Sequence, residues 1–255
     1  METTSIYGKI DEKGYLAIKQ GVTEIGDSAF RACTGLTKVN LPDSVTKIGE
    51  RAFEECTNLA EINIPGSVTE IGDFAFSGCK NLAEITIPDS VTEIRGNAFA
   101  GCKRLKEITI PNSVTEIREW TFSGSGLTKV TIPDNVTNFK GYAFAGCKGL
   151  KEITIPDSVK EIYWHAFEGC SGLKEITIPD SVTKICYYAF RCCTSLQSIT
   201  FKSAFPPTVP GAFPPSIPFD FLYCPSTTNI FIPKGTKENY LKWIGEENEH
   251  RLKEY

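Results

Sequence analysis

The chain has 255 residues, of which 41% are hydrophobic and 23% are charged, and its formal net charge is −4. This composition is typical of a folded globular chain and excludes the highly charged, weakly hydrophobic class of disordered proteins. An acidic chain has no surplus of positive charge for a phosphate backbone, and no apolar run reaches the roughly 18–20 residues that span a bilayer, so we expect neither nucleic-acid binding nor membrane insertion.

The N-terminal residues are predicted to form a cap. Residues 1–10 lack the basic and apolar regions of a signal peptide, which predicts a chain without an export signal and leaves a cytoplasmic location open. Residues 5–10 and 15–18 flank a turn-forming stretch at 11–14, a pattern that is typical of a hairpin. We therefore interpret residues 1–18 as an N-terminal cap.

Residues 19–201 consist of a regular repeat of 23 residues. Phe recurs at steps of 23 with a single step of 22, and columns of Pro, Val, Ile and Cys keep the same spacing. A unit of this size cannot bury its apolar side alone, so the regularity predicts one continuous solenoid, with residues 1–255 as a single domain. The Phe column is predicted to be a buried spine that continues to Phe213. Its members within the regular repeats are Phe30, Phe53, Phe76, Phe99, Phe122, Phe144, Phe167 and Phe190.

One unit illustrates the structure predicted for all of them. Ile85 and Ile87 alternate with polar residues and precede Pro88, which is typical of a short strand that ends at a proline. Residues 91–94 form a second alternating stretch after a turn, and residues 98–102 suit one helical or 3₁₀ turn. We therefore predict an α/β repeat solenoid, in which parallel first strands stack about 4.8 Å apart and short second strands and helical turns complete each coil.

Residues 202–255 depart from the repeat. Prolines between residues 206 and 218 break the regular structure of a last, irregular coil. Residues 229–233 repeat the strand-and-proline signature, and residues 236–247 carry apolar residues at helical spacing. We interpret this segment as a Pro-rich last coil followed by a C-terminal cap.

The repeat closely resembles the leucine-rich repeats of the BspA type. The sequences Ile-Pro-Asp-Ser-Val-Thr at 87–92 and Ala-Phe-Ala-Gly-Cys at 98–102 recur almost verbatim across residues 16–201. The resemblance implies a curved, right-handed leucine-rich-repeat superhelix with parallel strands on its concave face. Members of this family are found mostly on the surfaces of bacteria and some parasitic protists and are associated with adhesion. The resemblance therefore implies a cell-surface or secreted module that binds a host, matrix or other surface protein, with no catalytic residue.

The ten cysteines are the first candidates for chemistry. Seven occupy one repeat position beside inward-facing residues, and Ser125 replaces the missing member, which predicts buried free thiols. Cys186, Cys192 and Cys224 lie off this column. A disulfide among these three residues and Cys193 is therefore an alternative to free thiols. A zinc site is disfavoured because paired C-x-x-C spacing is absent and neither His is close in sequence. The sequence also lacks the common nucleophile and phosphate-binding motifs, so we predict no metal, no cofactor and no enzymatic activity.

Aromatic residues that the repeat does not require form the first candidate binding surface. They lie at and beside the position two residues before the repeated Phe, and exposed Trp and Tyr supply much of the energy of protein interfaces. The alternatives are that they only stack on one another and shield the flank, or that they stack on sugar rings. These candidates are Phe74, Trp120, Tyr142, Tyr163, Trp164, His165, Tyr187 and Tyr188.

The outward positions of the first strands form the second candidate surface. A column of glutamates runs beside a column of threonines, and we expect Lys106, Lys151 and Lys174, one position away, to offset the repulsion between the carboxylates. The column is either an acidic track for a basic protein or a cation, or part of a purely structural sheet. A protein-binding module at the cell surface and an intracellular scaffold both remain open. The glutamates are Glu61, Glu84, Glu107, Glu152 and Glu175.

Overall fold

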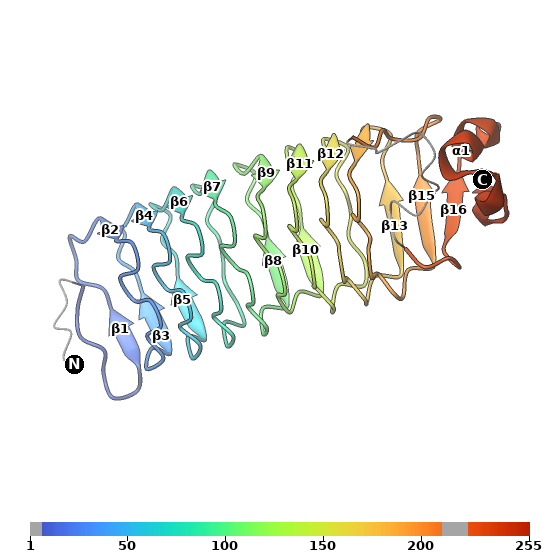
Figure 1. The fold of residues 1–255 in the computed structure, drawn as a ribbon. Helices are drawn as coiled ribbons and strands as arrows, with labels where there is room; N and C mark the ends of the chain where they lie inside the picture. The colour runs from blue at the N-terminus through green and yellow to red at the C-terminus, as the bar shows by residue number, and fades with distance from the viewer. Residues whose placement is uncertain (1–6, 211–223) are drawn as a thin grey trace.

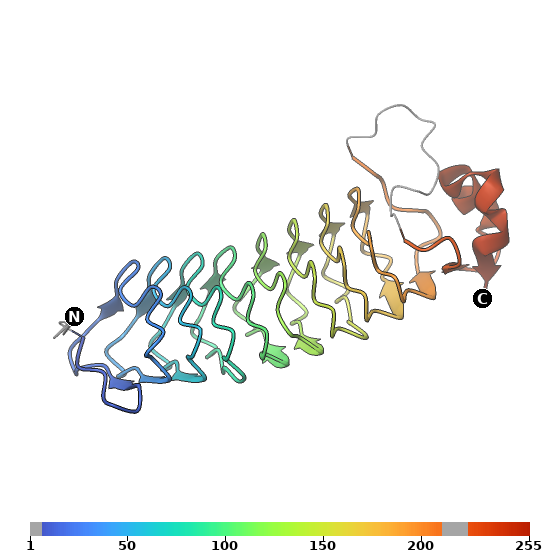
Figure 2. The ribbon, with the colours of Figure 1, turned by 60° about the horizontal axis from the view of Figure 1, so that its bottom comes forward.

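The computed structural model describes residues 7–210 and 224–255. The described chain forms coils that stack along one axis, and the helix α1 (Lys237–Ile244) lies at the C-terminal end (Figure 1). Most regular coils contribute a first strand and a second strand, and the two resulting ladders lie on opposite sides of the stacked coils (Figure 2). The predicted solenoid is therefore a parallel β-solenoid.

The first strands of successive repeats pair in parallel. The middle residue of a strand is buried and its neighbours are exposed, as Val39 shows between Lys38 and Asn40. Lys38 is level with Glu61 and Asn40 with Asn63, so equivalent residues of successive repeats lie side by side. The strands of this ladder are β1 (Tyr15–Ala17), β3 (Lys38–Asn40), β5 (Glu61–Asn63), β8 (Glu107–Thr109), β10 (Lys129–Thr131), β13 (Glu175–Ile178), β15 (Ser198–Phe201), β16 (Asn229–Ile232) and β17 (Leu252–Glu254).

The first-strand ladder is interrupted twice within the described residues. Its sheets have the strand orders β1-β3-β5, β10-β8 and β13-β15-β16-β17. Residues 84–87 lie between the first two sheets and residues 152–155 lie between the last two. Neither segment is a strand, and in the described chain neither makes a backbone hydrogen bond to the neighbouring repeats.

The second strands are two residues long and form a narrower ladder, which is divided into two four-stranded sheets within the described residues. In each of them a buried Ile or Phe follows a polar residue, as in Glu70 and Ile71. Thr208 extends this ladder by a parallel bridge to Lys184. The strands are β2 (Glu24–Ile25), β4 (Lys47–Ile48), β6 (Glu70–Ile71), β7 (Glu93–Ile94), β9 (Glu116–Ile117), β11 (Asn138–Phe139), β12 (Glu161–Ile162) and β14 (Lys184–Ile185).

The core lies between the two ladders and contains the Phe column. From Phe30 to Phe190 the rings of successive repeats stack with centroids 5.3–5.8 Å apart, and every ring except that of Phe30 is fully buried. Burial of each ring contributes roughly 1.5–3 kcal/mol to the free energy of unfolding. Phe213, which continues the spacing in the sequence, lies outside the described residues.

The helical turn predicted for each repeat is not confirmed. At residues 98–102 the backbone makes successive tight turns, in which Ala98 N–H donates to Arg95 C=O and Cys102 N–H to Phe99 C=O. Asn97 has a φ of 59° and Gly101 a φ of 71°, and such left-handed residues prevent a helix from continuing. The described chain contains α1 and the 3₁₀ helix η2 (Glu246–Arg251) at its end but little other helix, so the α/β description is not confirmed.

Both ends of the described chain cover the core. The predicted helix is α1, which buries Tyr240 and Ile244, and the predicted strand at 229–233 is β16. At the other end the ring of Tyr7 lies 5.2 Å from that of Phe30. The predicted turn at 11–14 is present, while residues 1–6 lie outside the described chain.

Candidate functional site

Two backbone positions of every regular repeat have a left-handed conformation, and the first of them carries most of the aromatic candidates. It is the position two residues before the repeated Phe, where the chain turns sharply after the second strand, and its φ lies between 56° and 62°. Such a φ favours Gly, Asn and Asp, and it costs larger residues conformational energy. The residues at this position are Ser28, Arg51, Phe74, Asn97, Trp120, Tyr142, His165 and Tyr188.

Four of these residues form a ladder of stacked rings. The ring centroids of Trp120 and Tyr142 are 3.8 Å apart, those of Tyr142 and His165 are 4.4 Å apart, and those of His165 and Tyr188 are 5.0 Å apart. Nδ1 of His165 is also 2.7 Å from Oε2 of Glu168. Stacking between successive coils therefore holds these rings in defined positions.

The aromatic candidates are not all exposed, which corrects the sequence-based expectation. Trp120 and Trp164 are 40% and 53% exposed, whereas the other six aromatic candidates are only partly exposed because neighbouring rings or side chains cover them. Phe74 is separate from the ladder, and the guanidinium of Arg51 lies 4.6 Å from its ring centroid. We call Trp120, Tyr142, Tyr163, Trp164, His165, Tyr187 and Tyr188 the aromatic surface.

An apolar groove of about 360 Å³ lies at the C-terminal part of the aromatic surface. Trp164 lines the groove, and its indole lies against Gly141, where an added Cβ would stand 2.5 Å from Nε1. The ammonium groups of Lys140 and Lys184 lie 4.7 and 5.1 Å from the centroid of the Tyr163 ring. The groove is lined by Tyr163, Trp164, His165, Lys184, Cys186, Tyr187, Tyr188 and Pro210.

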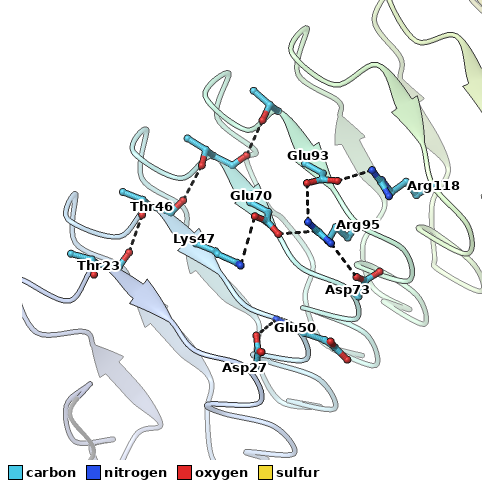
Figure 3. A network of polar contacts seen from close by, with 12 residues as sticks. Thr23, Asp27, Thr46, Lys47, Glu50, Glu70, Asp73, Glu93, Arg95 and Arg118 are labelled. Atoms are coloured by element: carbon cyan, nitrogen blue, oxygen red, sulfur yellow. Dashed lines mark hydrogen bonds and ion pairs between the residues drawn. The ribbon is translucent and has the colours of Figure 1, made fainter.

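A ladder of ion pairs runs along the second strands, and sequence reasoning missed it (Figure 3). Arg95 Nε is 2.8 Å from Glu70 Oε1 and its Nη2 is 3.2 Å from Glu93 Oε2, while Arg118 Nη2 is 2.6 Å from Glu93 Oε1. The missed signal is the replacement of Gly72 by Arg95, Arg118 and Lys140 at the same position of the next repeats.

The ion-pair ladder continues to the aromatic groove. Lys140 Nζ is 3.5 Å from Glu116 Oε2, and Lys184 Nζ donates a hydrogen bond of 3.0 Å to Glu161 Oε2. The hydrogen bond from Lys184 lowers the pKa of Glu161 and raises that of Lys184 itself. The second-strand side of the solenoid is thus largely charge-paired.

The strand face, by which we mean the outward side chains of the first-strand ladder, has few ion pairs. All five candidate glutamates are exposed there. Lys38 Nζ lies 2.6 Å from Glu61 Oε1, but within the described residues no ion pair joins Lys106, Lys151 or Lys174 to the column, so any offset of the repulsion by these lysines does not involve direct ion pairs. Two grooves, of about 720 and 660 Å³, lie on this face where the ladder is interrupted.

The described chain contains no disulfide, and all ten cysteines are free. In the repeated column each buried thiol donates to the carbonyl of the Phe of the preceding repeat, as Cys102 Sγ does to Phe76 at 3.2 Å. Burial raises the pKa of Cys102 to about 12, which makes it a poor nucleophile at neutral pH. Cys192 is exposed, and Cys224 Sγ lies 3.3 Å from Arg251 Nη2.

Two further features are absent from the described residues. No group of His, Cys, Asp and Glu side chains is arranged to hold a metal ion. Within the same residues, no helix combines the length and the apolar character needed to cross a bilayer.

The profile of the BspA type leucine rich repeat region, in 6 copies, matches residues 11–128 and 115–230. The chain belongs to this family. The leucine-rich repeat is a protein-interaction fold whose stacked units create extended binding surfaces. A comparison with curated proteins gave no match.

Solved structures of leucine-rich-repeat proteins are similar to this one. A leucine-rich repeat protein from Bacteroides ovatus ATCC 8483 aligns with a TM-score of 0.70 and 31% identity, over 86% of this chain and 63% of that chain. A leucine rich cell surface protein from Faecalibacterium prausnitzii A2-165 aligns with a TM-score of 0.50 and 34% identity, over 73% of this chain and 59% of that chain. The BspA-type repeat chain described here thus spans less than two thirds of either protein.

Proposed function

We propose that this BspA-type repeat protein is a non-catalytic module that binds another protein at the cell surface or outside the cell, and that the aromatic surface makes the contact. The observation that carries the proposal is the pair of exposed indoles, Trp120 and Trp164, on an otherwise stacked row of rings. A similar solved structure is that of a cell surface protein, which supports this location.

The aromatic surface is suited to tight contact because its rings are already ordered. Trp120 stacks on Tyr142 with an angle of 7° between the planes, and Trp164 rests on Gly141. A side chain that is ordered before binding loses less conformational entropy when a ligand covers it. Burial of two large indoles would therefore contribute to affinity with little ordering cost.

The chemistry of the aromatic groove supports binding rather than catalysis. The imidazole of His165 is paired with Glu168, and Cys186 is the thiol among the described residues that line the groove. Burial raises the pKa of Cys186, so at neutral pH this thiol is protonated and weakly nucleophilic. The groove therefore lacks an activated nucleophile.

An intracellular scaffold is the second candidate function. The observation that favours it is the complete set of free thiols, since cytosolic proteins keep their cysteines reduced. Titration of thiols in the native and the unfolded protein, purified from its source without reductant, separates the two locations. A disulfide among Cys186, Cys192, Cys193 and Cys224 favours export, and ten free thiols favour the interior of the cell.

The binding proposal is tested with the double variant Trp120→Ala/Trp164→Ala. Wild-type protein captures ligands from solubilised extracellular matrix, mass spectrometry identifies them, and the purified ligand is then titrated against both proteins. We expect the double variant to bind at least tenfold more weakly with an unchanged thermal melt. Tyr15→Ala is the matched control, because Tyr15 is 36% exposed on the strand face.

Three results would count against the aromatic surface as a protein-binding site. Equal affinity of the wild type and the Trp variant for the captured protein removes the two indoles from the interface. An equal loss in Tyr15→Ala shows a general effect of exposed aromatic residues. Capture of glycans in place of proteins, tested on a glycan array, replaces the proposal with carbohydrate binding.

A further inference from the structure

The larger groove on the strand face lies where the first-strand ladder is open on both sides. It has a volume of about 720 Å³ and contains residues 152–157, with β10 on one side and β13 on the other. In the described chain, residues 152–155 make no backbone hydrogen bond to either neighbouring repeat. Their carbonyl groups are therefore available to a donor from outside, in a region where an uninterrupted parallel ladder would have used them.

The groove carries an excess of negative charge. Its lining includes four carboxylates and two ammonium groups. Among the described residues none of these six groups forms an ion pair, in contrast to the paired charges of the second-strand ladder. The carboxylates belong to Asp134, Glu152, Asp157 and Glu175, and the ammonium groups to Lys129 and Lys202.

We propose that this groove, which we call the strand groove, binds an extended, arginine-rich segment of a protein partner. Glu152 and Glu175 occupy the same position in successive repeats, so a guanidinium placed between them meets two carboxylates. Its remaining N–H donors reach the free carbonyls of residues 152–155. A guanidinium carries five donors and no acceptor, which matches a groove whose carboxylates form no ion pair and in which the carbonyls of residues 152–155 lack backbone partners.

The chain itself shows that a cation and a carboxylate on adjacent rungs of this face can pair. Lys38 and Glu61 are level in neighbouring strands, and Nζ of the lysine lies 2.6 Å from a carboxylate oxygen. In the strand groove the neighbouring rungs carry Glu152 and Glu175, and among the described residues neither Lys129 nor Lys202 forms an ion pair with them, so both carboxylates are open to a cation from a partner. This site is separate from the aromatic surface, and it does not depend on the two indoles.

The second groove on the strand face provides an internal control. It has a volume of about 660 Å³ and surrounds residues 84–87, which also lack backbone hydrogen bonds to neighbouring repeats. Its charges are balanced, because Glu84 and Glu107 face Arg104 and Lys106 in the same lining. A cationic segment gains no comparable attraction there, although the backbone arrangement is the same.

The test measures binding of a fluorescent peptide of alternating Arg and Ser by anisotropy. The strand-groove variant is Glu152→Gln/Glu175→Gln, and the matched control is Glu84→Gln/Glu107→Gln, which changes the net charge by the same amount. We expect the first variant to weaken binding about tenfold and the second less than twofold, with a salt-dependent affinity for the wild type. Thermal melts confirm that both variants are folded.

Each of three results would overturn the strand groove as the site. An equal loss in both variants shows general attraction to an acidic protein. Absence of peptide binding to the wild type at low salt removes the site altogether. Loss of peptide binding in Trp120→Ala/Trp164→Ala transfers it to the aromatic surface. Conversely, retained peptide binding in the Trp variant supports the strand groove. This holds even if the Trp variant still binds its matrix protein, because that result counts against the aromatic surface alone.

Discussion

The indole of Trp164 lies against Gly141, the residue at the same position of the preceding repeat, and a Cβ on this glycine would stand 2.5 Å from Nε1. The glycine therefore makes room for the most exposed tryptophan of the aromatic surface. Small residues at one repeat and large residues at the next can thus shape a surface that no single repeat contains.

Gly141→Ala is expected to displace the Trp164 indole. The added methyl group occupies the space of the indole nitrogen, and the exposed side chain can move away at a cost of about 1 kcal/mol or less. In ¹⁹F NMR of protein labelled with 5-fluorotryptophan, we expect the Trp164 resonance to shift and that of Trp243 to stay. Gly66→Ala, which meets no atom within 4 Å, is the control, and an unchanged Trp164 resonance would contradict the packing.

Phe99→Ala is expected to lower the free energy of unfolding by about 3–5 kcal/mol. The ring is fully buried between Phe76 and Phe122, at centroid distances of 5.5 and 5.8 Å, so its loss leaves a cavity in the middle of the spine. Urea unfolding measures the change. Phe205→Ala, at a side chain that is 68% exposed, should have little effect, and equal stability of both variants would disprove the spine.

Ser28→Gly is expected to stabilise the protein by roughly 0.5–1 kcal/mol. Ser28 has a φ of 57°, a conformation that glycine adopts without the steric cost that a Cβ imposes. Ser171→Gly serves as the comparison. Ser171 is not in the left-handed region, so this substitution relieves no strain and only increases the conformational entropy of the unfolded chain. Chemical denaturation measures the free energy of unfolding of both variants. Destabilisation by Ser28→Gly would contradict backbone strain at Ser28.

Arg95→Met is expected to destabilise the protein by about 0.5–1 kcal/mol at low ionic strength and by less at high salt. Glu70 and Glu93 are level in neighbouring strands, and Arg95 lies within 3.2 Å of both carboxylates. Its loss leaves two like charges side by side. Lys174→Met is the control because Lys174 forms no ion pair in the described chain, and a salt-independent loss would show that the arginine acts through packing alone.

Stability is expected to fall steeply above pH 9 because the buried thiols cannot ionise. Burial raises the pKa of Cys56, Cys102 and Cys193 from 9.0 to about 12. The protonated thiols make their full contribution to stability below pH 9. As the pH rises from 9 toward the folded-state pKa, the contribution of each thiol to the free energy of unfolding falls by about 1.4 kcal/mol per pH unit.

Cys102→Ser tests this alkaline dependence. A hydroxyl fits the same column, since Ser125 is buried there with its Oγ 3.3 Å from Cys147 Sγ. In urea unfolding between pH 8 and 10.5 under reducing conditions, we expect a shallower decline for the variant than for the wild type. Identical slopes would show that Cys102 ionises equally in both states.

The local structure of each repeat was largely predictable from the residues. Pro88 predicts the end of the first strand, alternation predicts which Ile side chains are buried, and the apolar spacing after residue 236 predicts α1. The left-handed turn at Asn97 was not, because this conformation occurs at a position that accepts Arg, Trp and Tyr in other repeats. Its residue types therefore did not signal it.

The candidate surfaces were predictable as lists of residues but not as shapes. The sequence placed Trp120 and Tyr142 at one repeat position, while their 3.8 Å stacking follows from the contact between coils. The exposure of Trp164 depends on Gly141, one repeat away.

By itself, the sequence determined the repeat length, the inward columns and the order of strands and turns, because burial repeats identically in every coil and leaves a periodic pattern. The tertiary structure decided where the first-strand ladder opens, at residues 84–87 and 152–155, and which charges are paired, as between Arg95 and Glu93. These features depend on the spacing and alignment of neighbouring coils. Side chains from different repeats create them, so no single repeat encodes them.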